Sequence, residues 1–194
     1  ICSSDIGHKT EIGGVRLNIT SKRELSTAIA DILTNVQRHT PDAQLEGILI
    51  ESMIENYIAE LMVSLRRDAQ FGLILTIASG GVLTEILQDA STLLVPADDL
   101  SVLAALDSLR MARLLGGFRG GPAVSRQAIL DQIQALVRLM HARSEIVEIE
   151  INPMMLGPDY AICADALITV IDGNDPPETT SSHAANSGSH KRSN

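Results

Sequence analysis

The sequence predicts an α+β fold, in which a mostly antiparallel sheet has helices packed on one side. Polar residues suited to capping precede several helical segments, and those segments alternate with runs of β-branched and aliphatic residues. Two of the β runs are joined by the short link 67–72, which is long enough for a hairpin turn but not for a parallel crossover. Hydrophobic residues make up 45% of the chain and aromatic residues 2%, so the core must be aliphatic.

In the first half of the chain, Ser21-Lys22-Arg23-Glu24 has the pattern of a capping box. A helix should follow and end near Thr40, before a proline, with an apolar face formed by Leu25, Ile29, Ile32, Leu33 and Val36. Residues 45–53 read as a buried strand. Residues 59–67 and 73–77 read as the two strands of the hairpin.

In the second half, residues 93–95 form a strand that stops at Pro96, and Asp98 or Asp99 caps a helix that runs to about Leu115. The pair Gly116-Gly117 ends that helix, and Ser125 caps another. Residues 146–151 and 161–171 are then two strands. We predict a structured domain over residues 1–171 and a disordered tail over 172–194, where Pro, Ser, Thr, Asn and Gly predominate.

The composition excludes several classes of partner. A formal net charge of −9 disfavours binding to nucleic acid or to an anionic membrane surface. The longest uncharged run, between Asp68 and Glu85, is too short to span a bilayer. Cys2 and Cys163 are far apart in sequence and have no metal-ligand spacing, which favours a reducing compartment, and we expect a cytoplasmic protein.

The segment 8–15 combines an imidazole, an ammonium group and a pair of glycines. Gly13-Gly14 can turn backbone N–H groups toward an anion, and Lys9 adds a point charge suited to phosphate. His8 can accept or pass on a charged group near neutral pH. The alternative is a Gly-Gly turn with His8 and Lys9 at the surface, which the pattern alone also fits.

The last two predicted strands hold a second candidate site. If their turn is centred between Pro158 and Asp159, Asn152 lies directly opposite Asp165, with the two Cβ atoms about 5 Å apart. Glu150 shares that face because side chains alternate along a strand. Such oxygen groups suit Mg²⁺ when water and substrate phosphate complete its shell. The alternative is a polar turn at Asn152-Pro153 with Asp165 as a solvated strand residue.

Taken in order, these stretches resemble the ATP-grasp domain of ADP-forming acyl-CoA synthetases, relatives of the succinyl-CoA synthetase β subunit. The resemblance runs from Ile1 to about Val170. The segments that carry it are 8–15, Glu60 with 67–72, Gly80-Gly81 with Glu85 and Asp89, Arg119-Gly120, and 150–153 with Asp165.

The resemblance implies an ATP-grasp-like fold whose N-terminal lobe is truncated, and it assigns roles residue by residue. His8 corresponds to the histidine that is transiently phosphorylated, and Asn152 and Asp165 to the Mg²⁺ ligands. Residues that contact the nucleotide, ATP or ADP, are implied to be Lys9, Gly13, Gly14, Glu51, Met53, Glu60 and Arg119. The implied partner is an acyl-CoA-binding α-type subunit or fused domain.

The chain also departs from the family pattern. Leu167 and Leu93 stand where the family usually has arginines, and Gln88 stands where it has a lysine. Ala78-Ser79 replaces a glycine before Gly80-Gly81, and the strand with an ATP-binding lysine is expected just before Ile1. The expected activity is therefore that of a ligase part, inactive as an isolated piece. The alternative is a non-catalytic nucleotide-binding module, for example fused to an acetyltransferase domain.

Overall fold

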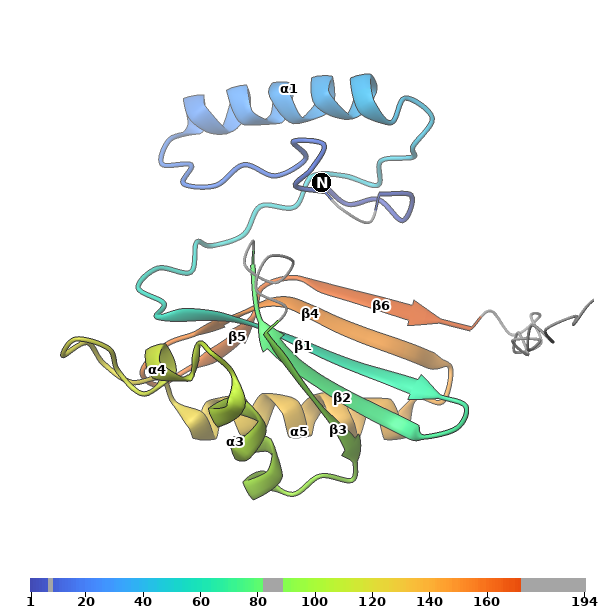
Figure 1. Cartoon of the computed structure of the whole chain (residues 1–194). Coiled ribbons are helices and arrows are strands. Elements are labelled where there is room, and N and C mark those ends of the chain that lie inside the picture. Colours follow the sequence, from blue (N-terminus) through green and yellow to red (C-terminus); the bar gives the residue numbers. More distant parts are fainter. Residues whose placement is uncertain (7–8, 82–88, 172–194) are drawn as a thin grey trace, which may run out of the picture.

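The computed structural model describes residues 1–6, 9–81 and 89–171. A small N-terminal part holds helix α1 (Lys22–His39) and the loops around it, and a larger part holds the sheet (Figure 1). The extended link 48–58 joins them. The N-terminal part has its own apolar cluster, in which Ile6, Ile32 and Val36 are buried.

Helix α1 begins as the sequence predicts. Ser21 is the N-cap, and its side chain accepts the N–H of Glu24, while the Glu24 carboxylate reaches back to the N–H of Thr20 at 2.8 Å. The buried stripe, however, is rotated from the predicted face: Ala28 is buried beside Ile32 and Val36, and Leu33 is 44% exposed.

The described strands form one sheet in which every pairing is antiparallel, as predicted. The strand order is β3-β2-β1-β4-β5, and β6 also pairs with β4. The strands are β1 (Ala59–Asp68), β2 (Gly72–Ser79), β3 (Ala90–Val95), β4 (Ile146–Leu156), β5 (Ala161–Cys163) and β6 (Ala166–Val170).

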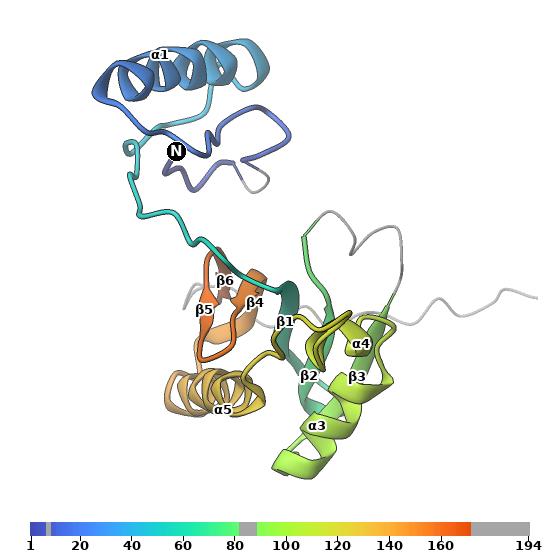
Figure 2. The same cartoon turned by 90° about the vertical axis from the view of Figure 1, so that its left-hand side faces the viewer.

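Helices cover one face of this sheet and leave the other open (Figures 1 and 2). They are α3 (Asp99–Ser108), α4 (Ala112–Leu115) and α5 (Arg126–Ala142). Aliphatic side chains of β1, β2 and β4 alternate into the covered face, and the largest fully buried ones include Leu61, Leu65, Leu75, Ile77 and Ile149. The helix-free face is turned toward α1 and its loops (Figure 1).

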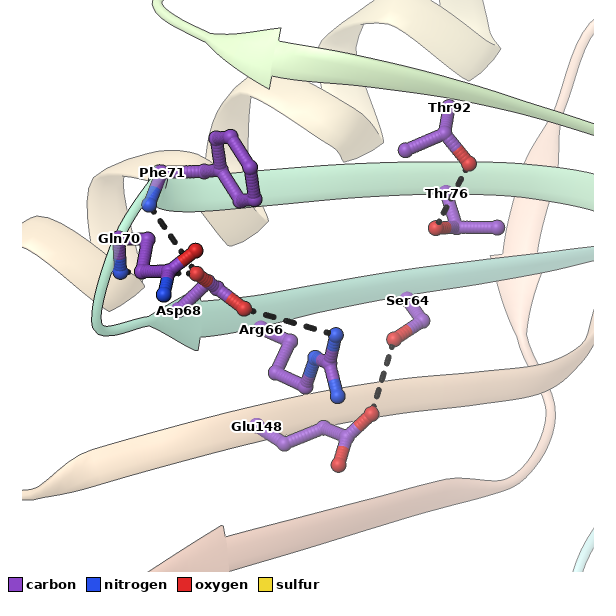
Figure 3. Close-up of polar contacts among 8 residues, drawn as sticks. All are labelled: Ser64, Arg66, Asp68, Gln70, Phe71, Thr76, Thr92 and Glu148. Atoms are coloured by element: carbon purple, nitrogen blue, oxygen red, sulfur yellow. Dashed lines mark hydrogen bonds and ion pairs between the residues drawn. The ribbon is translucent and has the colours of Figure 1, made fainter. Parts of the chain in front are cut away.

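The open face carries polar side chains along its central strands. Ser64 on β1 donates to Glu148 on β4 at 3.2 Å, and the hydroxyl groups of Thr76 and Thr92 lie 3.4 Å apart across β2 and β3 (Figure 3). Alternation along the central strands β1 and β4 therefore separates an aliphatic face from a more polar one.

The predicted strand at 45–53 is wrong. Within the described chain, this segment makes one isolated bridge, between Cys2 and Gly47, and continues as an extended link. Leu49 and Ile50 are 60% and 64% exposed. The apolar pattern resembles a strand, but the described residues place no further strand beside it to complete a ladder.

Two other elements are interrupted. The predicted helix to Leu115 is split into α3 and α4 at residues 109–111. The predicted strand 161–171 is split into β5 and β6 at Ala164 and Asp165. Both interruptions lie at polar contacts that shape the site described below.

Arg67 joins β1 to the end of α5. Its guanidinium donates to the carbonyl oxygens of Ile146 (2.8 Å), Met140 and Arg143. Carbonyls at a helix C-terminus lack intrahelical partners, so this side chain satisfies groups that the helix itself cannot.

We therefore expect Arg67→Met to lower the free energy of unfolding by roughly 2–3 kcal/mol, because charged hydrogen bonds to partly buried carbonyls are lost. Arg66→Met is the matched control. Arg66 is exposed, and its ion pair with Asp68, at 3.9 Å, is a surface pair worth less than about 1 kcal/mol. Urea titration of both variants measures the difference. Equal stabilities would contradict the structural role of Arg67.

Candidate functional site

A β-bulge in β4 lies at Asn152 and Pro153. Leu61 pairs with Met154 and Val63 with Ile151, so two residues, Asn152 and Pro153, lie opposite one residue of β1. Ile151 and Met154 both stay buried although they are three positions apart. Alternation from Ile151 places Asn152 on the open face, and the extra residue of the bulge returns Met154 to the buried face.

The predicted pairing of Asn152 with Asp165 is confirmed. Every pair between β4 and β5 keeps the predicted register, for example Met154 with Cys163, and the Asn152 N–H donates to the Asp165 carbonyl at 3.2 Å. Ala164 donates to the Pro153 carbonyl at 3.0 Å. Pro153 has no N–H to return, so the ladder breaks there and β5 and β6 separate.

Glu150 lies on the same face as Asn152, as predicted, and is half-buried. Its direct cross-strand partners are Ser64 on β1 and Leu167 on β6, which is 56% exposed. On the β6 side an aliphatic side chain therefore stands at the position where the family pattern has an arginine.

Gly80 and Gly81 bring the end of β2 to Asn152. The Gly80 N–H donates to the Glu60 carbonyl at 2.9 Å, and the Gly81 N–H donates to Asn152 Oδ1 at 3.1 Å. A Cβ on Gly80 would collide with the backbone of β1, and one on Gly81 would collide with the Glu60 carboxylate. Gly81 also has φ +66°, so glycine is required by space at Gly80 and by conformation at Gly81.

Glu60, which the sequence predicts to contact the nucleotide, thus lies near Asn152, with Gly81 between the two side chains. Its carboxylate also accepts a hydrogen bond from Tyr57, and this bond raises the pKa of the Tyr57 hydroxyl. The structure brings together Glu60, Asn152 and the backbone of Gly81 at the open edge of the bulge.

Lys9 reaches the same place from the N-terminal part. Its Nζ lies 3.6 Å from Asp165 Oδ1. Lys9 begins a tight turn in which the Gly14 N–H donates to the Lys9 carbonyl at 2.8 Å and the Gly13 N–H donates to the Thr10 carbonyl at 3.0 Å. Both glycine amides are therefore used inside the turn, and Lys9 provides the positive charge at this position.

The other predicted residues lie apart from this group. Glu51 and Met53 are exposed on the extended link. Arg119 is exposed on the loop after α4 with φ +52°, and its guanidinium lies 5.2 Å from the Phe118 ring centroid. His8, together with Glu85 and Gln88, lies outside the described residues.

Sequence reasoning missed the role of Asp89. This carboxylate is buried, accepts the Ser79 hydroxyl at 2.7 Å and accepts the N–H of Arg110 at 2.8 Å and of Met111 at 3.3 Å. Those two amides lie between α3 and α4, where the predicted long helix is interrupted, so their hydrogen bonds to Asp89 stabilise the interruption. Burial opposes ionisation, but the Arg110 N–H and the Ser79 hydroxyl outweigh it and lower the pKa of Asp89.

Because the pKa of Asp89 is lower in the folded state, its ionised form stabilises the fold at neutral pH, and this contribution is lost as the pH falls through the folded-state pKa. We expect Asp89→Asn to lower stability at pH 7 by roughly 1–3 kcal/mol, since one amide side chain cannot accept all three bonds. The variant should also lose less stability than the parent on acidification. Thermal unfolding at pH 7 and at successively lower pH tests this, and parallel losses in both proteins would refute it.

Comparison with known proteins identifies the family to which this fold belongs. The sequence profile of the ATP-grasp domain matches residues 1–170. The chain belongs to the ATP-grasp domain family. It is 35% identical over 166 residues to the β subunit of acetate–CoA ligase [ADP-forming] I from Pyrococcus furiosus, covering 86% of this chain and 71% of that subunit. It is 32% identical over 154 residues to acetate–CoA ligase [ADP-forming] I from Archaeoglobus fulgidus, covering 79% of this chain and 22% of that protein.

Solved structures of similar sequence have the same fold. An acetyl-coenzyme A synthetase from Ca. Korarchaeum cryptofilum, in complex with coenzyme A and Ca-AMPCP, superposes with a TM-score of 0.81 at 32% identity, over 87% of this chain and 73% of that one. A second structure of that synthetase holds Mg-AMPPCP, with its phosphohistidine segment pointing towards the nucleotide site; the TM-score is 0.69 at 28% identity, over 88% and 74% of the two chains. The ATP-grasp chain thus spans about three quarters of those chains and about a fifth of the longer ligase from Archaeoglobus.

The residues at the bulge fit a hard cation. Asn152 and Asp165 offer an amide and a carboxylate oxygen, the donor type that Mg²⁺ takes when nucleotide and water supply the rest. In the described parts of the chain, no group of three or more His, Cys, Asp or Glu side chains is placed to hold a metal by itself.

No described helix is both long and apolar enough to cross a membrane.

Proposed function

We propose that this ATP-grasp chain is the nucleotide-binding part of an ADP-forming acid–CoA ligase, which catalyses acyl-CoA + ADP + phosphate ⇌ acid + ATP + CoA. The observation that carries the proposal is the meeting of Lys9, Asn152 and Asp165 at the open face of the sheet. The family match and the ligase relatives support the same reaction class.

The proposed roles follow from the positions of the side chains. Asn152 and Asp165 would hold Mg²⁺, which neutralises and bridges phosphate oxygens of the nucleotide when bound. Lys9 supplies a cation to the phosphates, and Glu60 fixes Gly81 and thereby the edge of the site. His8 directly precedes Lys9 in the sequence, and Lys9 contacts Asp165.

We assign the phosphoryl carrier to His8. A neutral imidazole is a competent nucleophile near pH 7, and Lys9 offers the adjacent positive charge that stabilises a transferred phosphoryl group. His39 and His141 lie in the last turns of α1 and α5, where a basic side chain interacts favourably with the helix C-terminus and needs no catalytic role. The roles of Gly13, Gly14, Glu51, Met53 and Arg119 in nucleotide binding stay predictions.

The proposed partner is an acyl-CoA-binding α-type subunit or fused region, by analogy with the β subunit and the longer ligase among the relatives. The acyl phosphate would form there, and the phosphoryl group would then pass through His8 to ADP. Cys2 and Cys163 are both free thiols, which accords with a cytoplasmic setting.

A second function, a non-catalytic nucleotide-binding module, is favoured by one observation. Leu167 faces Glu150 where a basic partner is expected, so one element of the family's charge pattern is lost. This module would bind Mg-nucleotide without phosphorylating His8, and the labelling experiment below separates it from the ligase.

The metal assignment predicts the behaviour of Asp165→Asn. In the full-length protein that contains this chain, this change should weaken Mg-AMPPCP binding about tenfold or more, which corresponds to at least ~1.4 kcal/mol, because a charged oxygen ligand is lost. Asp159→Asn is the matched control, since Asp159 is an exposed residue in the turn of the same hairpin. Calorimetric titration measures both. Unchanged binding in the Asp165 variant would show that the hairpin is structural.

The carrier assignment predicts phosphorylation of His8. Incubation of the full-length protein with Mg-ATP labelled at the γ-phosphate should give an acid-labile, base-stable phosphoprotein. The label should be absent in His8→Ala and retained in His141→Ala, whose imidazole lies in the last turn of α5. Full labelling of the His8 variant would remove the carrier role. Binding of Mg-ATP without any labelling of the parent would favour the non-catalytic module.

A further inference from the structure

The contact between Lys9 and Asp165 joins the two parts of the molecule. Asp165 belongs to the segment between β5 and β6, and Lys9 belongs to the loop that precedes α1. The Lys9 side chain is 30% exposed and the Asp165 side chain 58% exposed. Asp165 Oδ1, the atom nearest the ammonium, also accepts the Ala166 N–H at 2.9 Å.

The backbone of Lys9 is held in place independently of this contact. The Gly14 N–H bonds to its carbonyl, and a Cβ at Gly14 would collide with that oxygen and with Ile1. Asn35 on α1 donates to the Gly13 carbonyl at 3.2 Å. The turn that carries Lys9 is therefore fastened to α1, and the ammonium is delivered to Asp165 from a fixed base.

On this geometry we infer that Lys9 and a divalent cation are alternative partners of Asp165. The inference rests on the proposed function, in which Asp165 is a metal ligand. A carboxylate oxygen that already has an ammonium at 3.6 Å cannot take a dication without bringing two positive charges close together. Lys9 must then leave, and the polyphosphate that arrives with the metal offers it a new anionic partner.

This exchange has two consequences for binding. Metal alone must displace the ammonium and binds weakly, whereas metal with nucleotide supplies both new partners at once. Binding of the metal and of the nucleotide is therefore cooperative. The Lys9 ammonium contacts Asp165 before the exchange and phosphate after it.

Binding of Mn²⁺ alone to the full-length protein, measured from the paramagnetic resonance signal of the free ion, tests the exchange. Lys9→Met should tighten Mn²⁺ binding two- to fivefold, the range expected for removal of a partly exposed ion pair. Lys9→Arg should keep the parent affinity because the competing charge remains. Lys22→Met is the matched control, since it removes the same charge from the exposed first residue of α1.

A second measurement adds AMPPCP. The factor by which the nucleotide tightens Mn²⁺ binding should be smaller in Lys9→Met than in the parent, because the variant has no ammonium to transfer to phosphate. Equal Mn²⁺ affinities in Lys9→Met and Lys22→Met, or weaker binding in Lys9→Met, would overturn the inference. So would parent-like Mn²⁺ affinity in Asp165→Asn. Failure of the parent to bind Mg-AMPPCP would instead refute the proposed function.

Discussion

Pro153 cannot donate a backbone hydrogen bond, and the arrangement of the site depends on this one missing N–H. The residue lies in the middle of β4, where an interior strand would ordinarily exclude proline. The chain accommodates it with a bulge against β1 and with a break between β5 and β6 on the other side. Alternation along β4 places Asn152 on the open face just before the bulge, and the break leaves Asp165 in an irregular segment opposite it. The two proposed metal ligands thus lie on either side of the point where the ladder is interrupted.

Much of the sheet half was predictable because its signals are local. The register between β4 and β5 follows from the position of the turn at Pro158 and Asp159, since a hairpin's pairing is set once its turn is known. The caps at Ser21, Asp98 and Ser125 are likewise readable because each oxygen bonds to an amide three positions on. Asn152 and Asp165 could therefore be paired from their residue numbers alone.

The parts that could not be predicted depend on partners far along the chain. The segment 45–53 has strand-like composition, yet a strand exists only where a neighbour pairs with it, and pairing is a tertiary property. The helix after Asp98 is interrupted because Asp89, 21 residues before Arg110, accepts hydrogen bonds from the backbone amides of Arg110 and Met111. Likewise, the Gly81 N–H bonds to Asn152, which lies 71 residues further along the chain, and periodicity does not encode that contact.

The charges gathered at the open edge explain why a cation matters to this chain. Glu60, Glu150 and Asp165 are carboxylates on or beside the bulge, and Lys9 is the cation that the described structure places in contact with one of them. With Leu167 opposite Glu150 on β6, that position of the described sheet has no guanidinium to balance the carboxylate. In the proposed function, a nucleotide polyphosphate would add further negative charge, and a metal that offsets both sets of oxygens would have to accompany it. The proposed nucleotide binding would therefore depend more on Mg²⁺ and on Lys9 than in a chain with the arginine.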